Sequence, residues 1–435
     1  MLLFLFLVSC ASTKEGRKTG PVHDDGARQD FVFHEASRQA VLGNYDAASD
    51  LYRHSLSLDS TSAASMYGLA QLYMSLGDRR ALQSFAPVTD SLLAGAVRLE
   101  PDNYWYRRLY AVNLQRMNRT DDAVAQYEEL ASRFPGNTEL LLTLAGLYDR
   151  MGEYGKELRV LTRYGRIEDV ADELRMQRVA CYLELGELDS AYLESDDPDR
   201  ILEILTESAN DMLGRIETDM DRMRCRSMID MVSDFSDVAI KYNPGLMQAW
   251  KSKSTTQVWY GERDKALETI DKGLAQVGDS LGKAALFNMR AEFHHLWGNQ
   301  TMVYEDYDSV LAYSPLDVMA MNNYAYYLSL EDRDLNRALE MSHKTIEADP
   351  LNATYLDTYA WILFRMGRYK DALQYLEKAL QYLEEENADI YEHYGDCLFK
   401  CGDKEAALEN WHRAFQLNSD SPLLERKIKE ENYIE

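Results

Sequence analysis

Apolar residues recur along the chain at the spacing of one helix face. In one segment Leu141, Leu144, Ala145 and Tyr148 stand at i, i+3, i+4 and i+7, which places them on the same side of an α-helix. Gly152 follows, and glycine supplies the left-handed turn at which many helices end. The pattern predicts a short amphipathic helix with a sharp end. It recurs at Leu69-Ala70-Tyr73 with Gly77, at Tyr359-Ala360-Leu363 with Gly367, and at Tyr394-Gly395-Leu398 with Gly402.

The second helix of the unit has a pattern of its own. It carries a small residue and, four positions later, a large one, so both lie on one face. Small residues let two helices approach closely, and large ones fill the space beside the contact. The pairs are Ala48 and Tyr52, Ala123 and Tyr127, Ala266 and Ile270, Ala372 and Leu376, and Ala407 and Trp411.

The two helix patterns alternate with a fixed period. Pro101 and Pro135 lie 34 residues apart, and Pro315 and Pro350 lie 35 apart. A period of 34 with glycine in the middle and proline at the end resembles that of the tetratricopeptide-repeat (TPR) family. This resemblance implies an all-α fold, a right-handed α-solenoid of stacked helix-turn-helix repeats. We expect about ten helical pairs plus a C-terminal capping helix.

The repeat register also predicts the domain organisation. An N-terminal array spans residues 29–194 and a C-terminal array spans 247–420, with a degenerate, methionine-rich helical joint at 195–246 between them. Residues 421–435 carry many charges and are expected to form a solvated capping helix that closes the array. The expected pairs are 29–62, 63–103, 104–137, 138–171, 172–194, 247–280, 284–317, 318–352, 353–386 and 388–420.

The first ten residues form an apolar run that ends at a cysteine. Nine residues are too few to span a bilayer as a helix, but residues 1–9 suit the apolar region of an export signal. Leu7-Val8-Ser9-Cys10 resembles the bacterial lipobox, so Cys10 is the expected lipidation site and 10–28 a flexible tether. By the same resemblance, Ala11 favours the outer membrane of the cell envelope. An accidental apolar start is the alternative, because no Lys or Arg precedes the run.

The formal net charge of −26 limits the classes of partner. Nucleic acid and anionic lipid surfaces both require clustered positive charge, so neither is expected to bind. A protein partner should be basic or neutral where it touches the chain.

Few residues form a pattern typical of metal binding or catalysis. His393, Cys397 and Cys401 follow one another at i, i+4 and i+8, on one helix face. Zinc requires a fourth ligand and usually a turn between ligands, so we interpret the cysteines as packing residues and expect no metal. The series Asp332-x-Asp334-x-Asn336 begins like a calcium loop, but Arg337 stands where glycine is needed. We find no catalytic triad, nucleophile elbow or phosphate loop, and expect no cofactor.

The TPR resemblance also implies where a ligand would bind. Members of the family present a concave surface lined by the first helix of each repeat. Carried over to this sequence, the ligand-facing positions are Tyr67, Gln71, Trp105, Arg108, Gln115, Arg116, Lys251, Asn288, Glu292, His295, Asn322, Tyr326, Asp357, Trp361, Phe364, Arg365, Glu392 and Asp396. Aromatic and amide side chains suit extended peptides or sugar rings. Packing against a neighbouring repeat is the alternative role for each tryptophan.

These observations favour a non-enzymatic, lipid-anchored scaffold that binds a protein or peptide. A glycan-capturing outer-membrane lipoprotein built on TPR helices is one alternative, although its sugar site would need long loop insertions. A helical enzyme is another, and it would need a cluster of acid, base or metal groups that the sequence does not show.

Overall fold

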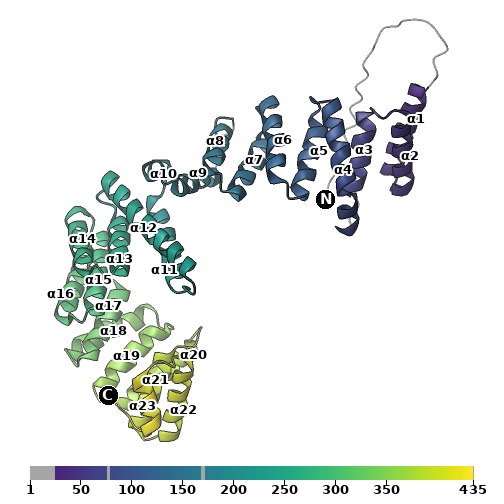
Figure 1. Ribbon diagram of the computed structural model, residues 1–435. Helices are drawn as coiled ribbons and strands as arrows, with labels where there is room; N and C mark the ends of the chain where they lie inside the picture. The colour runs from purple at the N-terminus through teal and green to yellow at the C-terminus, as the bar shows by residue number, and fades with distance from the viewer. Residues whose placement is uncertain (1–24, 76–78, 168–171, 435) are drawn as a thin grey trace. The chain divides into compact units, whose positions relative to one another are not determined.

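The computed structural model describes residues 25–75, 79–167 and 172–434. Within these ranges the chain is all-α, with no strand (Figure 1). None of the described helices combines the length and apolarity that a membrane crossing requires. The helices are α1 (Asp25–Val41), α2 (Tyr45–Leu58), α3 (Ala63–Ser75), α4 (Arg79–Leu99), α5 (Tyr104–Arg116), α6 (Thr120–Arg133), α7 (Thr138–Met151), α8 (Tyr154–Tyr164), α9 (Asp172–Glu184), α10 (Leu188–Glu194), α11 (Pro198–Leu213), α12 (Asp219–Tyr242), α13 (Met247–Trp259), α14 (Arg263–Gln276), α15 (Ser280–Leu296), α16 (Gln300–Tyr313), α17 (Val318–Leu330), α18 (Leu335–Ala348), α19 (Ala353–Arg365), α20 (Tyr369–Tyr382), α21 (Ala388–Cys401), α22 (Lys404–Leu417) and α23 (Pro422–Glu430).

Each odd-numbered helix up to α21 packs against the even-numbered helix that follows it, and each pair packs against the next within its unit. This confirms the expected α-solenoid of helix pairs. The chain divides into two compact units, Met1–Glu194 and Ser195–Glu435. In each unit, we use "concave surface" for the side that the odd-numbered helices line.

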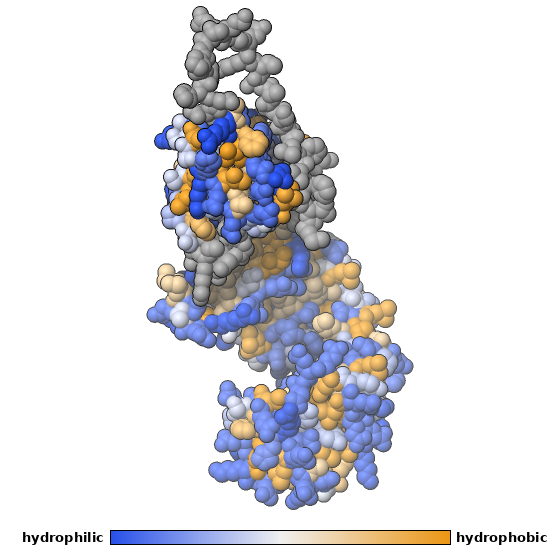
Figure 2. Space-filling model, turned by 90° about the vertical axis from the view of Figure 1, so that its right-hand side faces the viewer, coloured by the Kyte–Doolittle hydropathy of each residue, from blue (hydrophilic) through white to orange (hydrophobic). Residues whose placement is uncertain are grey.

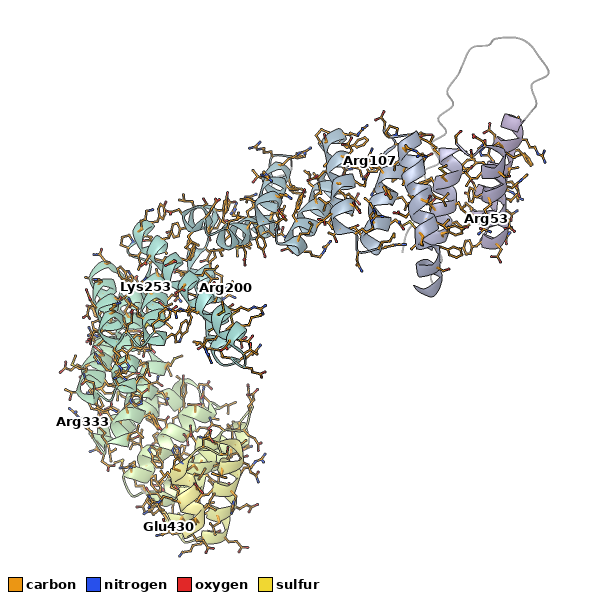
Figure 3. The ribbon with its side chains drawn as sticks, viewed as in Figure 1. Arg53, Arg107, Arg200, Lys253, Arg333 and Glu430 are labelled. Atoms are coloured by element: carbon orange, nitrogen blue, oxygen red, sulfur yellow. The ribbon has the colours of Figure 1, made fainter. Side chains whose placement is uncertain are left out.

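The segment 195–246 forms a regular helical pair, α11 and α12, which packs on α13 in the second unit. Lys253 of α13, labelled in Figure 3, donates a hydrogen bond of 2.6 Å to Asp237 of α12. The chain therefore has eleven pairs within the described residues, one more than the sequence suggested, because the 24 residues of α12 break the 34-residue register.

The small residues of the second helices lie in the seams between helices. Ala372 and Ala407 are fully buried, and Trp411, the large partner of Ala407, is also fully buried. A Cβ atom on Gly395 of α21 would lie 2.5 Å from the Trp411 ring. Helices α21 and α22 can therefore approach only because this position has no side chain.

The capping helix α23 is less solvated than its charges suggested. Its N-terminus is capped by Ser421, whose hydroxyl accepts a hydrogen bond from the Leu424 backbone N–H. Leu424 and Lys427 are both buried, and α23 packs against α22. The expectation of a wholly solvated cap is wrong for these two residues, because one face of α23 covers the last repeat.

Candidate functional site

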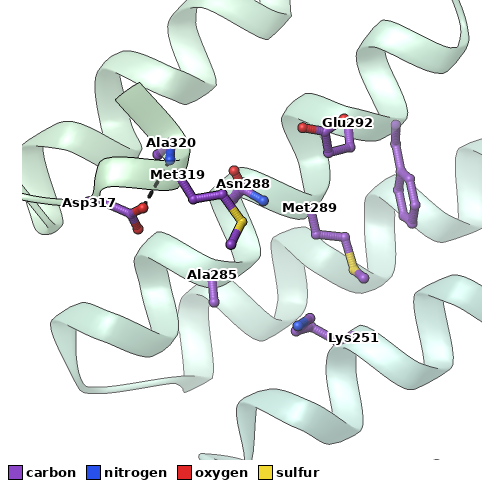
Figure 4. A pocket seen from close by; sticks show the side chains of 9 residues that line it. Lys251, Ala285, Asn288, Met289, Glu292, Asp317, Met319 and Ala320 are labelled. Atoms are coloured by element: carbon purple, nitrogen blue, oxygen red, sulfur yellow. Dashed lines mark hydrogen bonds between the residues drawn. The ribbon is translucent and has the colours of Figure 1, made fainter. Parts of the chain in front are cut away.

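A pocket opens on the concave surface of the second unit, where α13, α15 and α17 meet (Figure 4). Its volume is about 360 Å³. Three residues that the sequence assigned to the concave surface, Lys251, Asn288 and Glu292, line it together. The full lining is Lys251, Ala285, Asn288, Met289, Glu292, Phe293, Asp317, Met319 and Ala320.

Local sequence fixes how the helices around the pocket begin. Asp279 caps α15 by accepting a hydrogen bond of 2.6 Å from the Gly282 backbone N–H. Asp317 caps α17 by accepting one of 2.9 Å from Ala320 N–H, and this carboxylate also lines the pocket. A carboxylate at a helix N-terminus satisfies an otherwise unpaired amide and interacts favourably with the helix dipole.

Glu292 is the most firmly held polar group of the pocket. Its carboxylate accepts a hydrogen bond from the Tyr307 hydroxyl, and another of 2.8 Å from the Tyr327 hydroxyl. Burial and the nearby Glu292 charge raise the pKa of both tyrosines. Both phenols therefore remain donors, and they hold the carboxylate in one orientation with lone pairs left to bind a ligand.

The rest of the pocket offers apolar surface and two polar groups without protein partners. Within the described ranges, neither the Lys251 ammonium nor the Asn288 amide has a hydrogen-bond or ion-pair partner. Met289 lies between Lys251 and Glu292 in the view of Figure 4, and its sulfur accepts a hydrogen bond of 3.2 Å from the Ser254 hydroxyl. Met319 is 64% exposed at the rim. The pocket can thus hold an alkyl chain with a polar end.

Helices α17 and α19, the first helices of the next two repeats, place their predicted residues deeper in the fold. Asn322 of α17 and Trp361 of α19 are buried. The Trp361 ring stacks on His393 at 4.1 Å between centroids, so Trp361 packs against the neighbouring repeat. Asp357 is buried as well and bonds to His393 Nδ1 at 2.8 Å. Arg365 pairs with Asp332 at 2.6 Å.

Tyr326 faces acidic neighbours on the same surface. Burial raises its pKa to about 12, and the carboxylates of Asp357, Asp389 and Glu392 contribute to that shift. Two of these carboxylates are already paired, since Asp357 bonds to His393 and Glu392 to Lys427 of α23.

A buried lysine occupies the concave surface of the last repeat. Lys427 of α23 donates hydrogen bonds to Glu392 at 2.7 Å and to both oxygens of Asp396 at 2.7 and 2.9 Å. Asp396 also accepts one of 2.9 Å from Trp411 Nε1. Tyr433, beyond α23, packs its ring near that of Phe364. Sequence reasoning missed this arrangement, because a lysine in a charged terminal segment gives no sign of burial.

Most of the predicted residues of the first unit contact other residues of their own repeat or of a neighbouring repeat. Tyr67 packs against Tyr106, while Gln71 stays exposed. Trp105 is 60% exposed, so it does not pack into a neighbouring repeat as Trp361 does. Arg108 pairs with Glu139 of α7, Gln115 accepts a hydrogen bond from the Tyr127 hydroxyl, and Arg116 donates to the Met74 carbonyl.

The structure does not assemble the histidine–cysteine series into one cluster. His393 bonds to Asp357, Cys397 is buried and Cys401 is exposed. Across the described ranges, no group of three or more His, Cys, Asp or Glu side chains is arranged to hold a metal ion. Cys10, the predicted lipidation site, and residues 10–24 of the predicted tether lie outside the described residues, whereas 25–28 belong to the first turn of α1 and are not a flexible tether.

Comparisons with known proteins agree with the repeat pattern. The family described as "Tetratricopeptide repeat" matches residues 363–409. The chain is 30% identical over 120 residues to TPR repeat-containing protein PA4667 of Pseudomonas aeruginosa, covering 28% of this chain and 20% of that protein. It is 26% identical over 182 residues to TPR repeat-containing protein MJ1428 of Methanocaldococcus jannaschii, covering 38% and 31%. The matched part thus spans less than a third of each relative's length.

Solved structures include a similar chain in the crystal structure of the APC/C hetero-tetramer Cut9-Hcn1. It is 13% identical and covers 93% of this chain and 96% of that one, with a TM-score of 0.41. A score this low adds nothing to what the helix pairs already show.

Proposed function

Because the chain is a tetratricopeptide-repeat protein, we propose that it is a non-enzymatic scaffold that binds a polypeptide on its concave surface. The pocket carries this proposal, because three successive repeats line it: α13 contributes Lys251, α15 contributes Asn288 and Glu292, and α17 contributes Met319. The lining of the pocket combines polar side chains with apolar ones. Such a lining suits the side chains of a peptide.

Site-specific photo-cross-linking tests this function in cells. A photoreactive amino acid at Asn288 should form a covalent adduct with a protein partner. The control position is Lys272, an exposed residue of the second helix α14, which should give no such adduct. Equal adducts at both positions, or none at Asn288, would contradict binding at this surface.

We further propose that the chain is anchored by lipid at Cys10 in the bacterial cell envelope, in the outer membrane. The apolar run that ends at Leu7-Val8-Ser9-Cys10 supports this, as does the polar stretch after it. Labelled palmitate should attach to the wild type and not to Cys10→Ser. Cys401→Ser, which removes an exposed cysteine, should keep the label. Labelling of Cys10→Ser at the wild-type level would refute the anchor.

A further inference from the structure

Two carboxylates occupy equivalent positions three repeats apart on the concave surface of the second unit. They are Glu292 of α15 and Asp396 of α21. Each accepts a hydrogen bond from an aromatic residue of the helix that follows, at equivalent positions again: Tyr307 for Glu292, and Trp411 for Asp396. The same small arrangement of acid and aromatic donor is therefore built twice.

The two arrangements differ in the residue that the first helix of the following repeat contributes beside the carboxylate. At Asp396 it is Lys427, whose ammonium is 3% exposed and bonds to both carboxylate oxygens. At Glu292 the equivalent residue is Asn323, which carries no charge, and the group of α17 that donates to Glu292 is the Tyr327 hydroxyl. Within the described ranges, no Lys, Arg or His forms an ion pair with Glu292. Among the described residues, the chain therefore places a cation of its own at Asp396 and none at Glu292.

Glu292, the carboxylate without a cation, lines the pocket. Glu292 forms one wall, and Met289, Phe293 and Met319 give apolar surface beside it. The lining carries two carboxylates, of Glu292 and Asp317, against one ammonium, of Lys251. A cation with an alkyl stem matches this lining, and the net charge of −26 favours a basic partner.

We propose that this pocket receives a lysine side chain of the bound polypeptide, whose ammonium takes at Glu292 the place that Lys427 takes at Asp396. The inference rests on the proposed function and names the residue that the concave surface recognises. The lysine stem lies against Met289 and Met319, and the ammonium donates to the Glu292 carboxylate, a charge-assisted hydrogen bond.

Exposed leucines on the helices around the pocket and on the next repeat indicate which residues would flank that lysine. Leu281, Leu316 and Leu351 stand 35 residues apart, at or just before the start of α15, α17 and α19, and are 73%, 86% and 59% exposed. Leu281 precedes the pocket residue Ala285 by one turn, and Leu316 adjoins Asp317. On the face that it presents, Figure 2 shows orange apolar residues scattered among blue hydrophilic ones. Apolar side chains flanking the lysine would cover this row.

Methyl NMR of the full chain tests the assignment at the pocket itself. Methionine methyl groups are ¹³C-labelled, and the signals of Met289 and Met319 are assigned from Met289→Leu and Met319→Leu. The probe is acetyl-Leu-Ala-Lys-Ala-Leu-amide, compared with the same peptide carrying norleucine or glutamate at its centre. The lysine peptide should shift both signals saturably and bind about tenfold or more tightly than the norleucine peptide, the value of a hydrogen bond to a charged group.

Variants of the pocket residues distinguish a loss of charge from a loss of folding. Glu292→Gln should weaken the lysine peptide about tenfold, while Glu292→Asp, which keeps the charge, should restore part of the loss. Glu305→Gln, at an exposed acid of α16, should change nothing. Lys251→Met should leave binding of the lysine peptide equal or stronger. Methyl spectra without peptide report whether each variant is folded.

Three results would overturn the assignment. Equal affinity for the norleucine peptide would mean that the pocket binds only the apolar part of the side chain. Tighter binding of the glutamate peptide, lost in Lys251→Met, would assign the pocket to an anion. Cadaverine bound as tightly as the lysine peptide would move the ligand from a polypeptide to a free diamine. The first two results leave polypeptide binding standing, whereas failure of cross-linking at Asn288 removes the proposed function itself.

Discussion

Lys427 of α23 and Asp396 of α21 form an ion pair that is almost wholly removed from solvent, with side chains 3% and 2% exposed. Burial raises the pKa of the Asp396 carboxyl, and the ammonium of Lys427 opposes that shift. An unpaired charge here would have neither water nor a counter-ion. The pair therefore attaches α23 to the last repeat and closes the open end of the array.

Replacing Lys427 by methionine should loosen that end. The change leaves the Asp396 carboxylate buried without its cation, which costs about 3–5 kcal/mol when one member of a buried pair is removed. Hydrogen exchange should show faster exchange of the amides of α21 and α22. Lys429→Met, two residues further along α23 and exposed, is the control and should match the wild type. Unchanged protection in Lys427→Met would show that the pair contributes little to closing the array.

The close approach of α21 and α22 gives a second prediction. In Gly395→Ala, the new methyl group would lie 2.5 Å from the Trp411 ring and 3.1 Å from the Ala407 carbonyl oxygen, so the helices must move apart. Overpacking of this kind costs about 1–3 kcal/mol. The matched control is Gly146→Ala in α7, where the nearest atom is 3.7 Å away. That change should stabilise the protein by about 0.5–1 kcal/mol through helix propensity.

Urea unfolding monitored by circular dichroism measures both glycine variants. A lower midpoint for Gly395→Ala and a higher one for Gly146→Ala is expected. If the two midpoints moved in the same direction, packing at Gly395 would not be the governing effect.

The repeat fold could be predicted from the sequence because its signals are local and periodic. Gly152 and Gly402 adopt positive φ angles of 69° and 96° at the ends of α7 and α21, as expected from glycines that end helices. Ala407 and Trp411 lie in a seam between helices, as their spacing implied. These features repeat every 34 or 35 residues, so several copies support each other.

The site could be predicted only in part. The register brought Lys251, Asn288 and Glu292 to one surface, but it could not tell that Trp361 would be buried and Trp105 exposed. That difference depends on the neighbouring repeat, which places His393 against Trp361. The burial of Lys427 depends on carboxylates that lie 31 and 35 residues earlier. No local pattern records such a contact.

The two tryptophans should respond differently to substitution. Trp361→Ala removes a buried ring that stacks on His393 and Phe364, and losses of this kind cost about 3–5 kcal/mol. Trp105→Ala removes a ring that is 60% exposed, so stability should stay within about 0.5 kcal/mol. Urea unfolding of both variants measures the difference. A partner lost only in Trp105→Ala would then report on binding, whereas loss in Trp361→Ala could follow from unfolding. Similar destabilisation by both changes would contradict this account.

The contact between His393 and Asp357 predicts a stability that depends on pH. Burial favours the neutral imidazole, but the Asp357 carboxylate at 2.8 Å, helped by Asp396 and Asp389, outweighs it and raises the pKa of His393 above its ordinary 6.5. The folded state thus binds this proton more tightly than the unfolded state does. The resulting stabilisation is fully present below about pH 6.5 and is lost as the pH rises through the pKa of the folded state.

His393→Gln should therefore lower the free energy of unfolding most at pH 5.5, with the loss shrinking towards pH 9. Urea unfolding at a series of pH values measures the difference, and NMR titration of the His393 ring should give a midpoint above 6.5. His412→Gln, at an exposed histidine of α22, controls for the loss of a histidine elsewhere and should show no such trend. A deficit that grew with pH would mean that the imidazole is neutral in the fold, and the Asp357 contact would then be a hydrogen bond without a charge on the ring.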